Sequence, residues 1–113
     1  MKYLLTTLIL LSTIITNAQN LNKKMQDPSR GMEVMINKCT RDAIASFPDF
    51  KASYDPYYAS YVVDSTSFKD LSTSLNDKKI TIVLGTWCGD SKLQVPHFLK
   101  IMDALKIKEE NIT

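Results

Sequence analysis

One cysteine, in the stretch GTWCGDS (residues 85–91), is the residue whose type and setting point most clearly to chemistry. A cysteine thiolate is a good nucleophile toward the sulfur atoms of a disulfide. A second thiol three residues further along would permit a two-cysteine exchange cycle, but Ser91 stands at that position. The chain has one other cysteine, Cys39. We therefore take Cys88 as the candidate nucleophile.

The residues on either side of Cys88 predict a strand, a sharp turn and a helix. Residues 80–84 (ITIVL) are β-branched or apolar at nearly every position, which is typical of a strand buried on both faces. Pro96 lies inside the helical pattern that follows and is expected to kink it. In that pattern, residues 92–105 carry apolar side chains at Leu93, Val95, Phe98, Leu99, Met102 and Leu105. Cys88 in the turn would lie near the helix N-terminus, where N–H groups and the helix dipole favour a thiolate.

Asp90 has two opposing effects in this setting. As an acid in the first helical turn it suits the helix dipole. As a negative charge two residues from Cys88 it opposes the thiolate and raises the pKa of the thiol. The sequence does not show which effect on the Cys88 thiol is larger. Asp90 therefore either only stabilises the helix start or also adjusts the pKa of Cys88.

The segment from Trp87 to Lys92, together with Pro96, resembles the active site of the thioredoxin family, W-C-G-P-C-K-x-x-x-P. The resemblance covers about residues 66–107, and five positions match: Trp87, Cys88, Gly89, Lys92 and Pro96. It implies an α/β fold, namely the N-terminal part of a thioredoxin-like fold preceded by a helical segment. It also implies Cys88 as the catalytic residue, without a cofactor or a metal, in surroundings shaped by Trp87, Gly89, Asp90, Ser91, Lys92 and Pro96.

Two departures from the family pattern change the expected activity. Ser91 replaces the resolving cysteine, and Ile82 stands where many thioredoxins have a buried acid. A serine hydroxyl cannot displace a mixed disulfide. We therefore expect thiol–disulfide exchange through mixed disulfides, with protein or small-molecule thiols and disulfides as partners and release by an external thiol.

The family also implies a further strand, a cis-proline facing the cysteine, a hairpin and a last helix. Few residues follow the kinked helix, and no later proline is present. Residues 111–113 resemble the start of the next strand. We therefore expect a fragment of the fold. The alternative to thiol exchange is a non-catalytic thioredoxin-like binding module or an inactive truncated fragment.

Residues 1–18 have the pattern of a secretory signal peptide. Lys2 gives a positive start, an apolar run follows, and Ala18 marks the expected cleavage site. The run is shorter than the roughly 20 residues that a membrane span needs. An uncleaved anchor is the alternative. After cleavage we expect no stable membrane span and a periplasmic or extracellular location, where disulfides persist.

Charge and ligand spacing argue against two other classes of protein. The formal net charge of +2 is far from the basic footprint of a nucleic-acid binder, so no nucleic-acid partner is expected. His97 is expected to point away from Cys88, and no further ligands gather around it, so no metal site is expected.

Residues 19–63 predict a helical and tyrosine-rich segment before the partial thioredoxin-like domain of residues 64–113. Asp27-Pro28 resembles a helix start, and Pro48 is expected to end that helix. The apolar positions at helical spacing are Met32, Met35, Ile36, Cys39, Ala43 and Phe47. On that face Cys39 is a candidate core thiol, and a disulfide with Cys88 is the alternative.

The second half of that segment predicts shorter elements. A loop is expected around Asp55-Pro56 and a short strand over residues 58–63. Ser67 and Asp70 resemble a capping box. A short amphipathic helix follows, with apolar positions at Phe68, Leu71 and Leu75.

Overall fold

The computed structural model describes residues 20–113, so the signal peptide predicted for residues 1–18 lies outside the described residues. The chain is a mixed α/β protein with one two-stranded antiparallel sheet and four helices in this part. Its contacts divide it between Thr40 and Arg41 into two compact units, which are described separately. Within residues 20–113, no helix is both long and apolar enough to cross a lipid bilayer.

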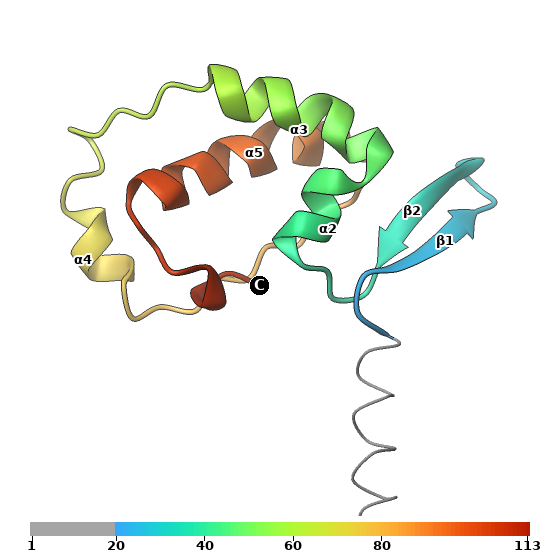
Figure 1. The fold of residues 1–113 in the computed structure, drawn as a ribbon, viewed down its shortest axis with the longest axis horizontal. Coiled ribbons are helices and arrows are strands. Elements are labelled where there is room, and N and C mark those ends of the chain that lie inside the picture. Colours follow the sequence, from blue (N-terminus) through green and yellow to red (C-terminus); the bar gives the residue numbers. More distant parts are fainter. Residues whose placement is uncertain (1–19) are drawn as a thin grey trace, which may run out of the picture. The chain divides into compact units, whose positions relative to one another are not determined.

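The first unit contains a β-hairpin where a helix was expected. Strand β1 (Lys23–Asp27) pairs antiparallel with β2 (Met32–Ile36), as Figure 1 shows. In the register of this pair, Met25 lies opposite Val34. The turn between them depends on Asp27, whose carboxylate accepts the N–H of Ser29 at 2.9 Å. The hydroxyl of Ser29 and the Arg30 side chain lower the pKa of Asp27 to about 2.

The helix predicted from Asp27 is therefore wrong over this hairpin. An aspartate that bonds the N–H two residues ahead forms a turn as readily as a helix start. Gly31 completes the turn at a positive φ of 66° and donates its N–H to the Asp27 carbonyl at 2.8 Å. Val34, left out of the helical pattern, gives an alternating strand pattern with Met32 and Ile36.

Proline starts a helix in the second unit where it was expected to end one. Helix α2 (Arg41–Ser46) ends before Phe47, and α3 (Pro48–Ser60) begins directly at Pro48. Proline is favoured at the first helical position because its missing N–H has no intrahelical role there. The predicted loop around Asp55-Pro56 and the strand predicted over residues 58–63 are both wrong. Pro56 lies inside α3, and residues 61–64 have no regular structure.

The core of the second unit forms between α3 and α5 (Gly89–Ala104). Figure 1 shows these two helices lying alongside one another, and both elements contribute buried side chains. Phe50 and Tyr54, one helical turn apart, are buried on α3, and Val95, Leu99 and Met102 are buried on α5. This packing offsets the hydrogen bond that Pro56 cannot donate. The helix predicted to run through Pro96 is confirmed, and Pro96 itself is fully buried.

A charged cluster connects three helices of this unit. The Arg41 guanidinium donates to both carboxylate oxygens of Asp103, at 2.7 and 2.5 Å. The Tyr58 hydroxyl donates to the same carboxylate at 2.6 Å. Hydrogen bonding from Arg41 lowers the pKa of Asp103, although burial opposes it. Asp103 therefore holds α5 to α2 and α3.

Two smaller predictions concern residues 64–75. The short helix is confirmed as α4 (Leu71–Leu75). The capping box is wrong, because the Ser67 hydroxyl donates to Asp64 and Asp70 makes no side-chain cap. Asp64 accepts from residues on its C-terminal side and forms a turn that competes with a cap.

The strand predicted over residues 80–84 is wrong as a regular element, because the segment makes only an isolated β-bridge at Ile80 and residues 81–84 have no assigned secondary structure. Ile80 forms a parallel bridge with Ile112, just after the 3₁₀ turn η1 (Glu109–Asn111). This pairing agrees with the strand start expected at residues 111–113. The expected burial on both faces is wrong, because Val83 is 94% exposed and Thr81 is also exposed.

Candidate functional site

The turn that carries Cys88 is closed by two hydrogen bonds. The Cys88 N–H donates to the Gly85 carbonyl at 3.0 Å, and the Gly85 N–H donates to the Ser91 hydroxyl oxygen at 3.2 Å. A Cβ on Gly85 would lie 2.9 Å from two atoms of the Trp87 indole. The ring therefore lies against the glycine backbone, and only glycine leaves space for it there. Thr86, between them, is almost completely buried.

Cys88 occupies the N-cap position of α5 with an extended backbone, at φ −82° and ψ 124°. This places its half-buried thiol beside the free N–H groups of the first helical turn. The backbone N–H and the hydroxyl of Ser91, followed by the backbone N–H of Asp90, lower the pKa of Cys88. Burial and the Asp90 charge act in the opposite direction but are outweighed. Asp90 therefore has both expected effects, and its backbone hydrogen bond adds to the lowering.

The Ser91 hydroxyl both accepts and donates a hydrogen bond in this turn. Its oxygen accepts the Gly85 N–H, which leaves its own proton available for the Cys88 sulfur. The same side chain therefore connects the residue that ends the extended segment to the thiol that begins the helix. A serine here supports a thiolate even though it cannot replace the resolving cysteine.

Lys92 points its charge toward α3. The Lys92 ammonium forms an ion pair with the Asp49 carboxylate at 2.7 Å. The backbone N–H of Lys92 donates to the Cys88 carbonyl at 3.0 Å. Asp49 was not identified from the sequence, although its place after Pro48 in a first helical turn is a usable signal. The pair fixes the first turn of α5, which carries Gly89 and Asp90, against α3.

His97 belongs to an aromatic cluster. Its ring stacks on Tyr61 at 4.4 Å between centroids and meets Tyr57 edge-on at 5.9 Å. It lies about two and a half helical turns along α5 from Cys88, which agrees with the expected separation. Among residues 20–113, no three His, Cys, Asp or Glu side chains gather in a way that could hold a metal ion.

Cys39 has a different environment. It follows β2 in irregular structure, so its predicted place on a helix face is wrong. Its sulfur contacts the carbonyls of Ile36 and Asn37 at 3.7 Å each, and burial raises its pKa. Both Cys39 and Cys88 are free thiols.

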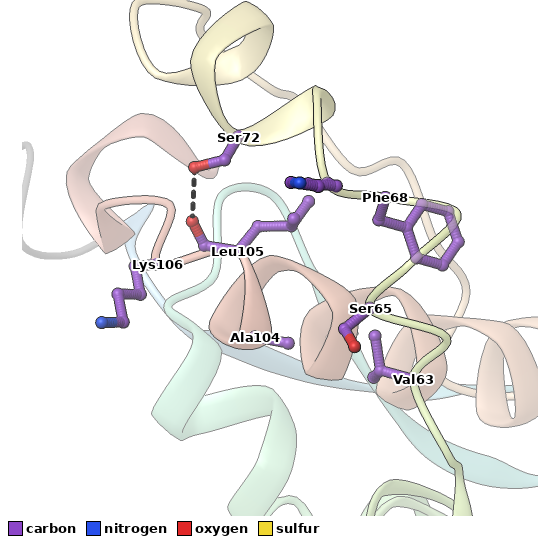
Figure 2. A pocket seen from close by; sticks show the side chains of 8 residues that line it. Val63, Ser65, Phe68, Ser72, Ala104, Leu105 and Lys106 are labelled. Atoms are coloured by element: carbon purple, nitrogen blue, oxygen red, sulfur yellow. Dashed lines mark hydrogen bonds between the residues drawn. The ribbon is translucent and has the colours of Figure 1, made fainter.

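An open depression of about 240 Å³ lies at the far end of α5 (Figure 2). In it the Ser72 hydroxyl donates to the Leu105 carbonyl at 3.1 Å. A helix of 16 residues is about 24 Å long, so this depression is separate from the thiol. Its lining residues are Val63, Ser65, Phe68, Lys69, Ser72, Ala104, Leu105 and Lys106.

Comparisons with known proteins bring no further information to the site. No protein-family model matches the chain, and no curated protein or solved structure matches it significantly. The functional argument therefore depends on the geometry and chemistry of the turn around Cys88.

Proposed function

We propose that this chain is an exported, thioredoxin-like thiol protein in which Cys88 exchanges thiols and disulfides through mixed disulfides. The observation that carries the proposal is the set of hydrogen-bond donors at the N-terminus of α5. The backbone N–H and hydroxyl of Ser91 and the backbone N–H of Asp90 lower the pKa of Cys88 against the opposing Asp90 charge, and so increase the fraction of reactive thiolate at neutral pH.

The reaction follows from the presence of a single thiol, Cys88, in the turn. The Cys88 thiolate attacks one sulfur of a disulfide R–S–S–R′, a Cys88–S–R bond forms, and R′–S⁻ leaves with the electron pair of the broken bond. Ser91 provides no second sulfur, so an external thiolate must attack the mixed disulfide to release R and regenerate Cys88. The substrates are protein or small-molecule disulfides, and an external thiol is the co-reactant.

The thioredoxin-like fold within this proposal is supported by the order of elements. An extended segment that pairs in parallel through Ile80 leads into the turn with Trp87 and Cys88, and a helix with an internal proline follows. Ser91 and Ile82 remain departures from the family. They argue for single-thiol exchange over a dithiol cycle.

Incubation of the purified chain with glutathione disulfide tests the chemistry. The expected product is one glutathione on Cys88, found by intact-mass and peptide mass spectrometry and removed by added reduced glutathione. The Cys39→Ser variant should react like the original chain, and Cys88→Ser should not form this adduct. Equal modification of Cys39 and Cys88 in the folded chain would contradict the proposal.

A third variant tests why the adduct persists. Ser91→Cys introduces a thiol that can attack the mixed disulfide, so it should release glutathione without an external thiol. Persistence of the adduct in this folded variant would show that the turn does not present position 91 to the sulfur of Cys88.

Export is a separate part of the proposal and depends on residues 1–18. Its test is the N-terminal residue of the chain recovered from cells of the source organism. Cleavage after Ala18 should leave Gln19 first. Recovery of an intact Met1 from the cytoplasm would contradict export and leave the thiol chemistry unaffected.

A second candidate function is a non-catalytic binding module, which the exposure of Trp87 favours. Its indole is 41% exposed, in contact with Gly85 and next to Cys88. In cells that depend on the chain, Cys88→Ser would then leave the phenotype unchanged and Trp87→Ala would remove it. The thiol-exchange proposal expects Cys88→Ser to remove it.

A further inference from the structure

Lys92 lies one helical turn from Cys88, but another helix holds its charge. The backbone N–H of Lys92 donates to the Cys88 carbonyl at 3.0 Å, so the two residues are separated by one turn. Side chains on a helix lean toward its N-terminus, a direction that leads from Lys92 to the thiol. The Lys92 ammonium instead pairs with the Asp49 carboxylate of α3 at 2.7 Å. The first positive charge of α5 is therefore neutralised by an acid from α3.

The core of the second unit fixes the two partners of this ion pair. Asp49 lies in the first turn of α3 and directly precedes Phe50, which is fully buried. Because α3 packs along α5, the Asp49 carboxylate is held beside the Lys92 side chain. The Lys92 side chain is only 20% exposed. The ammonium therefore has a defined position, which the contact between the two helices determines.

The charge of Asp90 remains beside the thiol. Asp90 lies in the first turn of α5, two residues from Cys88, and its charge acts on the sulfur. Lys92 lies in the same turn, but its pairing with Asp49 leaves no net charge on these two residues. A disulfide that approaches Cys88 therefore meets the Asp90 carboxylate, without a free ammonium in this turn to balance it.

We propose that Asp49 sets which disulfides react fastest with Cys88, because it holds the Lys92 ammonium away from the sulfur. Anionic disulfides are disfavoured by the Asp90 charge, and neutral or cationic disulfides are the preferred substrates. This inference rests on the proposed thiol exchange and adds the charge class of its substrate. Asp49 acts through Lys92 and is therefore a positioning residue.

Loss of the Asp49 charge should direct Lys92 toward the thiol. Asp49→Asn keeps the size of the side chain but removes its charge, so the ammonium is free to lie over the N-terminal turn of α5. There it balances the Asp90 charge. Complementary charge mainly changes the rate at which a site meets its partner. The rate with an anionic disulfide should therefore rise, and the rate with a cationic disulfide should fall.

Rates of adduct formation at Cys88 with disulfides of different charge test the proposal. At pH 7 glutathione disulfide carries net negative charge, cystamine carries net positive charge, and hydroxyethyl disulfide is neutral. The ratio of the glutathione disulfide rate to the cystamine rate should be about three- to tenfold higher in Asp49→Asn than in the original chain. High salt should remove this difference. The rate with hydroxyethyl disulfide should change by less than about twofold. Peptide mass spectrometry measures each adduct over time.

Two control variants separate the Lys92 charge from other effects. Asp55→Asn removes the same charge from α3, where Asp55 pairs with Lys51, and should change the ratio by less than about twofold. Asp49→Asn combined with Lys92→Gln removes both charges of the pair and should restore the original ratio. An unchanged ratio in Asp49→Asn, an equal rise in Asp55→Asn, or a rise that persists in the double variant would overturn the proposal.

The same measurements distinguish this inference from the proposed function. If none of the disulfides modifies Cys88 in the original chain, thiol exchange is refuted and the charge preference with it. If all of them modify Cys88 but the ratio does not depend on Asp49, thiol exchange stands and only the charge preference is refuted.

Discussion

The two ends of α5 use hydrogen-bond donors for different purposes. Near its C-terminal end, the Asp103 carboxylate receives donors from Arg41 and Tyr58 and holds three helices together. At its N-terminal end, Asp90 and Ser91 direct donors toward the half-buried Cys88 thiol and lower its pKa. Donors that meet a side chain held between helices contribute stability. Donors that meet an accessible thiol contribute reactivity, so the two properties should be separable by mutation.

The largest expected effect separates reactivity from stability completely. Cys88→Ser should reduce fast alkylation of the folded chain by iodoacetamide about tenfold or more, because Cys39 has a raised pKa and reacts slowly. The free energy of unfolding in urea should change by less than about 0.5 kcal/mol. A large loss of stability would mean that Cys88 also has a structural role.

The opposite separation is expected at Asp103. Asp103→Asn keeps the shape of the side chain but loses its charge, so its bonds to Arg41 weaken. The free energy of unfolding should fall by about 1–2 kcal/mol, a value that allows for partial exposure. The alkylation rate of Cys88 at pH 7 should stay within about twofold. A matched decrease in both quantities would show that the two ends of α5 are coupled.

The pH dependence of stability tests the role of Asp103 further, because the lowered pKa of Asp103 fixes the direction in which stability changes with pH. Its pKa is lower in the folded than in the unfolded chain, so it contributes stability above the unfolded value of about 3.9. That contribution is lost as the pH falls through the folded pKa. The difference in unfolding free energy between the original chain and Asp103→Asn should therefore shrink between pH 5 and pH 2. A difference independent of pH would contradict a role for the ionised carboxylate.

Ser91→Ala should affect only the N-terminal end. It removes one donor to the Cys88 sulfur but keeps the backbone N–H groups of Ser91 and Asp90. The pKa of Cys88 should rise, and alkylation at pH 7 should slow by a factor of about 3 to 10, as for one hydrogen bond. The pH profile of the alkylation rate measures both effects. An unchanged profile would leave the lowering to backbone groups alone.

The smallest effect is expected at the ion pair between Asp49 and Lys92. Asp49→Asn should cost less than about 1 kcal/mol, because the Asp49 side chain is 41% exposed and water screens the pair. Thermal unfolding at low and at high salt measures it, with the difference from the original chain disappearing at high salt. A salt-independent loss would indicate that Asp49 acts through packing.

The sequence allowed the turn around Cys88 to be predicted better than the rest of the chain. Spacing along α5 is helical throughout, and Pro96 is buried where neighbouring side chains stabilise the helix. Prolines and aspartates elsewhere caused the errors, because Asp27 forms a turn and Pro48 begins a helix. The local preferences of these residues suit both outcomes. At Asp27 the bonds to Ser29 and Arg30 favour the turn, and at Pro48 the packing of Phe50 and Tyr54 in the core favours the helix.

Site residues on distant segments could not be predicted in the same way. Asp49 reaches Lys92 only because α3 packs on α5, and no spacing rule connects residues 43 positions apart. The exposed face of residues 80–84 was also missed. An apolar run indicates a strand but carries no information on which of its faces other elements cover.

The contact between Trp87 and Gly85 also gives the chain an intrinsic optical reporter. Trp87 is the single tryptophan of the sequence, and its ring lies one residue from Cys88. The indole emission of the whole protein therefore originates at this turn. Disulfide formation at Cys88 changes the surroundings of the ring, so each step of the exchange can be followed in real time by fluorescence without an attached dye.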